Sequence, residues 1–501
     1  MKYTVLDYLE DTAAKYPDKV AFADINESIT WSKFVENSKK LSYFIAEHFD
    51  RGMAVPVMME KSVKTLEYFF AALYAGCFYS YFDSTFPDSR LTSMIETLGV
   101  TKIISERKNE KKLSGLPVTA LFTDEVIIEN KESVQGSRQK LIIDTDPVYA
   151  NFTSGTTGTP KAVLVNHKNV VDFLTCFTEI FEIKPEENIA NQAPFDFDVS
   201  VKDIFSGVFT GATVHLVPKA YFSFPTKLLD YLEEREITTL IWAVSALCII
   251  STLNGFSYKI PGKLKKIMFS GEVMPIKQLR KWKENVPDAE YINLYGPTEI
   301  TCNCTYYRLP KDIPEDYVTP MGIPFPNERV FLLDENDNLI TEKNIEGEIC
   351  VSGSCVALGY YDNPKTEQVF VQNPSNKKFF ERIYRTGDLG KYGDDDLFYY
   401  VGRKDTQIKH MGHRIELGEI EGTIEKNCSI TRAVTIFTNN KIYAFYTTAD
   451  NKPVEKKDIV TSLKTDLPVY MVPSDFIHIE EFPLTKNGKV DKRALEAKIN
   501  G

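Results

Sequence analysis

The sequence predicts an α/β protein with a large N-terminal domain of layered α/β subdomains and a small α+β C-terminal domain. Three observations support this fold class. The chain has 501 residues, more than one hydrophobic core normally organises. Short apolar strands alternate with amphipathic helices through about the first 400 residues, which is typical of layered, mainly parallel sheets. The composition then changes near residues 402–405.

The clearest elements of the large domain lie in two helix–strand pairs. The apolar periodicity predicts a helix over residues 62–75 that Gly76 ends, followed by an aromatic strand over residues 78–82. A second helix closes at residues 231–236, and a strand follows over residues 237–244. This order of elements favours parallel strands joined by helices.

A domain boundary is expected at the composition change. Residues 394–396 are three aspartates, typical of a tight turn, whereas residues 407–414 are basic and contain glycine. A glutamate-rich helix follows, and the remaining hundred or so residues suffice for a small domain. We therefore predict domains over residues 1–404 and 405–501.

Composition excludes several classes of protein. With 43% hydrophobic residues the chain is not disordered, and its net charge of −11 argues against nucleic-acid binding. Residues 1–20 lack an apolar signal core, and the longest apolar run, residues 240–253, is too short to span a bilayer. Eight scattered cysteines favour reduced thiols, and Cys302 with Cys304 lacks a second pair at zinc spacing. We expect a cytoplasmic protein without membrane insertion.

The most informative stretch of the chain is residues 153–161. Its glycines allow the backbone to approach an anion closely, its hydroxyls add donors, and Lys161 adds a positive charge. The spacing is not that of a Walker loop, because the glycines are too close and Ala162 follows the lysine. The stretch predicts a polyphosphate-binding loop, with a polar surface turn as the alternative.

Three further motifs fit a nucleotide site. Residues 293–299 follow a short strand, where Tyr295 can stack on a base and Glu299 can hold Mg²⁺; a β-turn with a helix starting at Thr298 is the alternative. The carboxylate of Asp388 can accept hydrogen bonds from two ribose hydroxyls; the alternative is a solvent-exposed aspartate in a turn. Lys489 follows an Asn-Gly turn that would project it as a point charge, although most exposed lysines have no such role.

Together these four motifs resemble the adenylate-forming superfamily of acyl-CoA synthetases, luciferases and peptide-synthetase adenylation domains. The resemblance runs from about Leu6 to Leu495. Departures are Ala162, where the family usually has glycine, and residues 79–83, where it has a Val-Pro-Ile-Asp-like run. Further matching segments are residues 347–353, 359–361 and 407–417.

The resemblance implies an AMP-forming ligase that uses ATP and Mg²⁺. Glu299 would hold the metal, and Thr153, Glu299 and Lys489 would be catalytic. Tyr295 and Asn293 would contact adenine, and Asp388 with Tyr400 the ribose. The ATP-binding residues by resemblance are Thr153, Ser154, Gly155, Thr156, Thr157, Gly158, Lys161, Asn293, Tyr295, Gly296, Thr298, Asp388, Tyr400 and Arg403.

Residues 195–201, 416–421 and 490–493 resemble the amino-acid-activating branch rather than the CoA ligases. In that branch an aspartate at the position of Asp198 pairs with the substrate's α-ammonium. A partly buried carboxylate is costly unless a cation meets it, so Asp198 predicts a cationic ligand. The alternative is that Asp198 caps the following helix.

The branch resemblance also implies a side-chain pocket. Its polar members favour a small polar amino acid such as Ser, Cys or Ala. Lys202 conflicts with this preference, because a buried ammonium needs an anionic partner; it indicates an acidic substrate or a side chain that swings out to solvent. The pocket residues are Asp198, Val199, Lys202, Trp242, Met268, Ser270, Leu294, Cys302, Asn303 and Lys489.

Two alternatives to this substrate assignment remain. Residues 191–195 and 268–275 resemble D-alanine–carrier protein ligases of teichoic acid modification, although these usually have Cys where this chain has Ser270. An acyl- or aryl-CoA ligase would use the same fold and should tolerate loss of the Asp198 carboxylate.

The resemblance finally implies two half-reactions. The amino acid carboxylate attacks ATP to give an aminoacyl-AMP. The small domain, mobile about a hinge at Asp405, then withdraws Lys489 and inserts the loop with Lys409, Gly412 and Arg414 to line a tunnel for a phosphopantetheine thiol. We expect a monomer that acts with a separate carrier protein.

Overall fold

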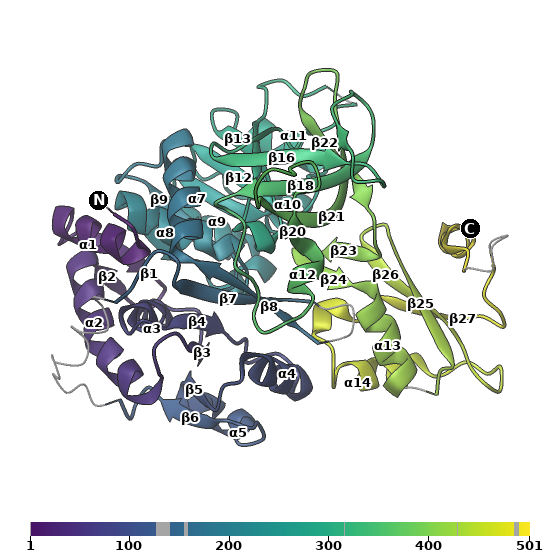
Figure 1. The fold of residues 1–501 in the computed structure, drawn as a ribbon, viewed down its shortest axis with the longest axis horizontal. Helices are drawn as coiled ribbons and strands as arrows, with labels where there is room; N and C mark the ends of the chain where they lie inside the picture. Colours follow the sequence, from purple (N-terminus) through teal and green to yellow (C-terminus); the bar gives the residue numbers. More distant parts are fainter. Residues whose placement is uncertain are drawn as a thin grey trace.

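Three β-sheets form the N-terminal part of the molecule and two smaller sheets form the C-terminal part, among the residues that the structure describes (Figure 1). The structure is a computed structural model. It describes residues 2–126, 141–154, 159–314, 316–427, 429–484 and 490–500.

The largest sheet has nine strands, six of them parallel neighbours. Its central strands are apolar and buried on both faces, as parallel strands between helical layers must be. In spatial order the strands are β15 (Ile323–Pro324), β14 (Thr305–Arg308), β13 (Glu290–Tyr295), β12 (Lys266–Ser270), β11 (Thr239–Ala243), β9 (Asn188–Asn191), β10 (Thr213–Leu216), β1 (Val20–Ala23) and β2 (Ser28–Thr30).

A second sheet of seven strands has a parallel centre and one antiparallel hairpin, in which Thr153 is paired with Lys161. The hairpin brings both ends of the predicted phosphate loop to one place. In spatial order the strands are β19 (Gly359–Tyr360), β8 (Lys161–Asn166), β7 (Pro147–Thr153), β4 (Phe78–Tyr81), β3 (Ala54–Met58), β5 (Lys102–Ser105) and β6 (Thr119–Phe122).

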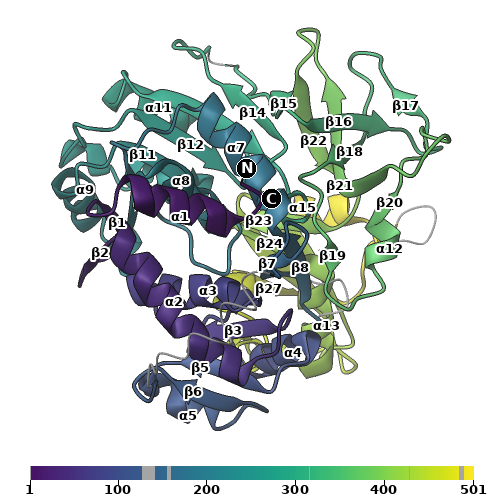
Figure 2. The same cartoon turned by 60° about the vertical axis from the view of Figure 1, so that its left-hand side comes forward.

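Helices cover both of these sheets. One apolar cluster joins the helices packed between the two sheets to strands of each (Figure 2). These inner helices are α1 (Val5–Lys15), α2 (Trp31–His48), α3 (Val63–Tyr74), α7 (His167–Ile180) and α8 (Val199–Thr210). The outer faces carry α9 (Pro225–Glu234), α10 (Val244–Thr252) and α11 (Ile276–Asn285) on the nine-stranded sheet and α4 (Asp88–Leu98) and α5 (Glu110–Leu113) on the seven-stranded one.

The third sheet is antiparallel and has α12 (Thr366–Val369) beside it. It contributes the carboxylate of Asp388 to the site. Its strands are β16 (Glu328–Leu333), β17 (Leu339–Ile340), β18 (Gly347–Gly353), β20 (Phe370–Gln372), β21 (Arg382–Tyr392) and β22 (Phe398–Arg403).

The C-terminal part begins after β22 with a two-stranded hairpin and continues as a three-stranded sheet with helices. Leu495 of the last helix packs into an apolar cluster of this part, and the helix lies at its far end in Figure 1. The elements are β23 (Gln407–His410), β24 (His413–Glu416), α13 (Leu417–Asn427), β25 (Arg432–Thr438), β26 (Lys441–Thr447), α14 (Lys456–Leu463), β27 (Asp475–His478) and α15 (Lys492–Asn500).

The predicted helix–strand pairs are confirmed. Helix α3 has Ser62 as its N-cap, whose side chain accepts a hydrogen bond from the amide of Thr65, and Gly76 follows with a left-handed φ of 71°. Strands β4 and β11 lie within the predicted ranges. The described cysteines are all free thiols, and no described helix is long and apolar enough to cross a membrane.

Candidate active site

Two cavities meet at the carboxyl ends of β7, β12 and β13, beneath the small C-terminal part. We call the smaller one, of about 100 Å³, the reaction cavity, and the larger one, of about 1440 Å³, the long cavity. Thr153, Asp198 and Thr298 line the reaction cavity. The two cavities share a wall formed by Phe197, Val199, Gly271, Arg403, Lys409, Gly412 and His413.

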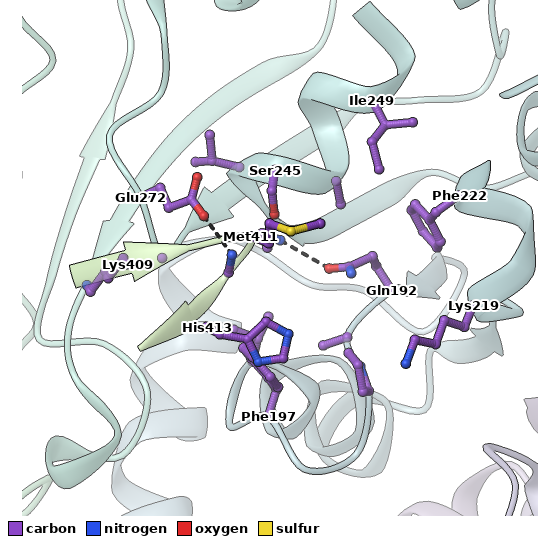
Figure 3. A pocket seen from close by; sticks show the side chains of 18 of the residues that line it. Gln192, Phe197, Lys219, Phe222, Ser245, Ile249, Glu272, Lys409, Met411 and His413 are labelled. Carbon is purple, nitrogen blue, oxygen red and sulfur yellow. Dashed lines mark hydrogen bonds between the residues drawn. The ribbon is translucent and has the colours of Figure 1, made fainter. Parts of the chain in front are cut away.

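The hairpin between β23 and β24 is inserted into this site (Figure 3). The amide of Gly412 donates a hydrogen bond of 2.6 Å to Oε1 of Glu272, and its φ of 81° is a left-handed value that favours glycine. His413 stacks on Tyr470 and meets Phe197 edge to face. The predicted loop residues Lys409, Gly412 and Arg414 therefore all reach the site.

Arg414 forms a buried ion pair with Glu299. Its Nη1 lies 2.7 and 2.9 Å from the two carboxylate oxygens, and the hydroxyl of Tyr360 donates to the same carboxylate at 2.7 Å. Burial alone would raise the pKa of Glu299, but the positive charges of Arg414 and Lys161 outweigh it and lower that pKa. The carboxylate predicted to hold Mg²⁺ is thus ionised and already neutralised by the protein in this arrangement.

The residues predicted to bind ribose and adenine converge on Asp388. The hydroxyl of Tyr295 donates to one of its oxygens at 2.5 Å, and Arg403 donates to the other at 2.7 Å. Asn293 donates to the carbonyl of Pro320, and with Tyr400 it lines the long cavity. Each carboxylate oxygen can accept more than one hydrogen bond, so this cluster still fits two ribose hydroxyls.

At the ends of the predicted phosphate loop, polar groups remain available to bind a ligand. The hydroxyl of Thr153 is buried without a hydrogen-bond partner, whereas Ser154 donates to the carbonyl of Arg414. The ammonium of Lys161 lies 4.8 Å from the centre of the Tyr360 ring. An orphaned buried hydroxyl beside a lysine fits a phosphate. The predicted residues Gly155, Thr156, Thr157, Gly158 and Lys489 lie outside the described part of the chain.

Asp198 lies at the start of α8, and its side chain does not cap the helix. This excludes the capping role considered above, and the residue instead lines the reaction cavity. Burial raises its pKa, which means that the ionised form lacks solvation and would gain from a cationic ligand.

Most of the predicted pocket residues gather near Asp198. Val199, Ser270 and Cys302 line the reaction cavity, and Met268 and Leu294 belong to the apolar cluster that includes Cys302. Lys202 is 1% exposed, so the alternative that it swings out to solvent is wrong. Its ammonium is bonded to the side chains of Ser270 and Asn303.

The prediction that Trp242 lines the pocket is wrong. Its indole donates to the carbonyl of Ala190 and its ring meets Phe222, within the apolar cluster on the opposite face of the nine-stranded sheet. Because side chains alternate along a strand, the neighbouring Ile241 faces the pocket side instead and joins the cluster of Met268 and Leu294. The other neighbour, Ala243, faces the same side as Ile241 and lines the long cavity.

Gly296 allows the turn that carries two pocket residues to approach β13. A Cβ on Gly296 would lie 2.5 Å from the Cα of Asn303 and 2.8 Å from the carbonyl oxygen of Cys302. Thr301 and Cys302 have φ values of 57° and 78°, a strained left-handed pair. Thr298 lines the cavity and also begins a short 3₁₀ turn, so the turn predicted as the alternative is present.

Sequence reasoning assigned no site role to Glu272, Tyr360, His413 or Gln192. Glu272 holds the inserted hairpin, Tyr360 holds Glu299, and Gln192 accepts a bond from Ala243 on the wall of the long cavity. Glu272 and Gln192 follow strands β12 and β9 directly, which is a signal for the edge of a parallel sheet.

Comparisons with known proteins agree with this geometry. The family model for AMP-binding enzymes matches residues 9–361. Surfactin synthase subunit 1 of Bacillus subtilis is 31% identical over 504 residues, which cover 98% of this chain but only 14% of that protein. The chain thus spans a small part of this relative.

Two solved structures share the fold. Holo-PA1221, an NRPS protein containing adenylation and PCP domains, has a TM-score of 0.85 and 24% identity and covers 99% of this chain and 84% of its own. The Vibrio cholerae adenylation domain AlmE, in complex with glycyl-adenosine-5'-phosphate, has a TM-score of 0.86 and 19% identity over 100% of this chain and 98% of its own. With the family match, the chain therefore belongs to the AMP-binding enzyme family.

Proposed function

We propose that this chain activates the carboxylate of an α-amino acid with ATP and transfers the aminoacyl group to the phosphopantetheine thiol of a carrier protein domain. The observation that carries the proposal is the position of Asp198 in a small cavity that shares a wall with a long one. A poorly solvated carboxylate attracts the α-ammonium of an amino acid, and the long cavity can admit a flexible thiol arm. The glycyl-adenylate and the PCP domain in the two solved relatives support both parts.

The first half-reaction joins two anions, so charge neutralisation and positioning must carry it. The carboxylate attacks the α-phosphorus of ATP, and pyrophosphate leaves. Lys161 and Arg403 supply fixed positive charge near the phosphates and ribose, and Lys489 would contact the substrate carboxylate. Glu299 with Thr153 would hold Mg²⁺, which neutralises phosphate charge when bound; this requires Arg414 to leave the carboxylate.

The observed arrangement suits the second half-reaction. With the hairpin inserted, Gly412 and His413 form part of the wall between the two cavities. A thiol that reaches this wall gives its proton to water, and its sulfur attacks the acyl carbon. The new carbon–sulfur bond replaces the bond to phosphate oxygen, and AMP leaves with that electron pair. Asp405, whose carboxylate accepts from Arg403, lies between the last strand of the large part and the hairpin and is the proposed hinge.

A small polar side chain is supported by Val199, Ser270 and Cys302, which line the reaction cavity beside Asp198. Ser, Cys and Ala fit this description. Asp198 also argues against a CoA ligase for acids without an amine, because its carboxylate would then stay uncompensated.

Amino-acid-dependent pyrophosphate release with hydroxylamine trapping tests the proposal. The panel contains L- and D-alanine, serine, cysteine, aspartate and glutamate, with acetate and salicylate as controls without an amine. Turnover of one α-amino acid, lost in Asp198→Ala, is the expected result. Turnover of D-alanine would favour the teichoic acid ligase, and turnover confined to the controls would refute amino acid activation.

A further inference from the structure

The ammonium group of Lys202 is buried next to Ser270, which lines the reaction cavity, whereas Lys202 itself lines neither cavity. Lys202 donates to Oγ of Ser270 at 3.0 Å and to Oδ1 of Asn303 at 2.8 Å, and both acceptors are neutral. Among the described residues, no carboxylate oxygen lies within 4.0 Å of this nitrogen. A lysine is rarely buried without an anionic partner, because the loss of hydration is costly.

The hydrogen bonds around Lys202 leave donors for a ligand. An ammonium has three N–H donors, and two of them are used here. Ser270 accepts from Lys202 and therefore keeps its own proton to donate. Ser270 lines the reaction cavity, with Lys202 directly behind it. A ligand in the cavity thus meets a hydroxyl donor that a cation polarises.

The nearest acidic side chains do not supply the missing negative charge. Asp203, the next residue on α8, accepts a hydrogen bond from Asn191, lies more than 4.0 Å from the Lys202 nitrogen, and has its pKa raised by burial. Glu299 is paired with Arg414. Asp198 lines the reaction cavity and, under the proposed function, meets the substrate's α-ammonium. Burial lowers the pKa of Lys202, and the charges of Asp198 and Asp203 oppose this effect. Neither carboxylate lies within 4.0 Å of the Lys202 nitrogen, so among the described residues this lysine has no direct anionic partner.

We propose that the substrate is an acidic α-amino acid of the aspartate and glutamate class. Its α-ammonium meets Asp198, and its side-chain carboxylate accepts from Ser270 and is neutralised by Lys202. The inference rests on the proposed function and narrows it. It also accounts for the small polar pocket, since the polar group is then a carboxylate rather than a hydroxyl or thiol.

ATP–pyrophosphate exchange with acidic amino acids and their amides tests this assignment. Asparagine and glutamine keep the shape and the acceptor oxygen but lack the charge. For the wild-type protein, kcat/KM for the better acid should exceed that for its amide by at least about tenfold, as expected for a charge-assisted hydrogen bond. In Lys202→Met this acid-to-amide ratio should fall by about 10- to 100-fold. Lys281→Met, which removes a lysine bonded to the Ser251 carbonyl outside both cavities, should keep the ratio.

Several outcomes would overturn the assignment. A wild-type preference for serine or alanine over both acids would do so, as would an unchanged ratio in Lys202→Met. Thermal melting checks that the variant is folded; if it is not, Ser270→Ala is decisive, because it keeps the lysine and should also lower the ratio. Exchange with acetate or salicylate but with no α-amino acid would instead refute the proposed function itself.

Discussion

Replacing Arg414 by methionine should separate the two half-reactions. In the observed arrangement the guanidinium contacts both oxygens of Glu299, which is 0% exposed. Without Arg414, docking of the hairpin would bury this carboxylate with the hydroxyl of Tyr360 as a hydrogen-bond donor and the charge of Lys161 nearby. The first half-reaction does not use this ion pair, so it should continue.

The size of the effect follows from the ion pair. Removing one partner of a buried pair costs about 3–5 kcal/mol, and loss of one charge-assisted hydrogen bond alone costs about 1.5–3 kcal/mol. Under the proposed movement the small part undocks and water reaches Glu299, so the expected penalty lies between about 1.5 and 5 kcal/mol. At about 1.4 kcal/mol per tenfold, thioester formation should slow by between about tenfold and a few thousandfold.

The assay compares both half-reactions in the same preparation. Pyrophosphate exchange should stay within about threefold of the wild-type value, whereas single-turnover transfer of the preformed adenylate to pantetheine should fall as calculated. Lys404→Met is the matched control, because this basic residue beside the hinge lines neither cavity. An equal fall in both steps would refute the reasoning, as would a transfer rate that does not change.

Three further predictions concern stability and packing. His167 accepts from the amide of Val5, and burial lowers its pKa from 6.5 to about 3. The unfolded chain therefore binds a proton that the folded chain does not, and the free energy of unfolding should fall by about 2 kcal/mol between pH 7 and 5. Urea unfolding of the wild type and of His167→Asn at both pH values measures this fall. An equal pH dependence of the two proteins would contradict the prediction. Gly296→Ala should lower the free energy of unfolding by about 1–3 kcal/mol and raise KM for the amino acid, because its Cβ would overlap backbone atoms of Asn303 and Cys302. An unchanged melting temperature and KM would argue against this close approach. Trp242→Phe should lower the melting temperature but keep the order of preference among the amino acid substrates. A changed order of preference would indicate that Trp242 contacts the substrate.

The fold could be predicted because its signals are local. Helix α3 has a cap, an apolar face and a terminating glycine within one short stretch, and β11 is an apolar run after a helix. The residues proposed to bind the nucleotide could be named only from the resemblance. Thr153 and Tyr295 end strands β7 and β13, whereas Asp388 lies within strand β21.

The site predictions are incomplete or wrong where the position of a side chain depends on contacts between segments that are distant in the sequence. Whether Ile241 or Trp242 faces the pocket depends on the register that places Ala243 opposite Ser270, and no local pattern fixes that register. The ion pair of Glu299 with Arg414 joins residues far apart in the chain. The burial of Lys202 depends likewise on Ser270 and Asn303 from two other segments. Whether its side chain is buried or exposed could therefore not be predicted from the sequence of α8 alone.

The shared wall between the two cavities has a consequence for the hydrolysis of the adenylate. Part of that wall is formed by Lys409, Gly412 and His413 of the small C-terminal part. If this part moves as proposed, the wall is complete only while the hairpin is inserted, and the movement that opens a route for the thiol also shields the activated acyl group from bulk water. The rate at which adenylate is hydrolysed without an acceptor would then measure how often the hairpin is withdrawn.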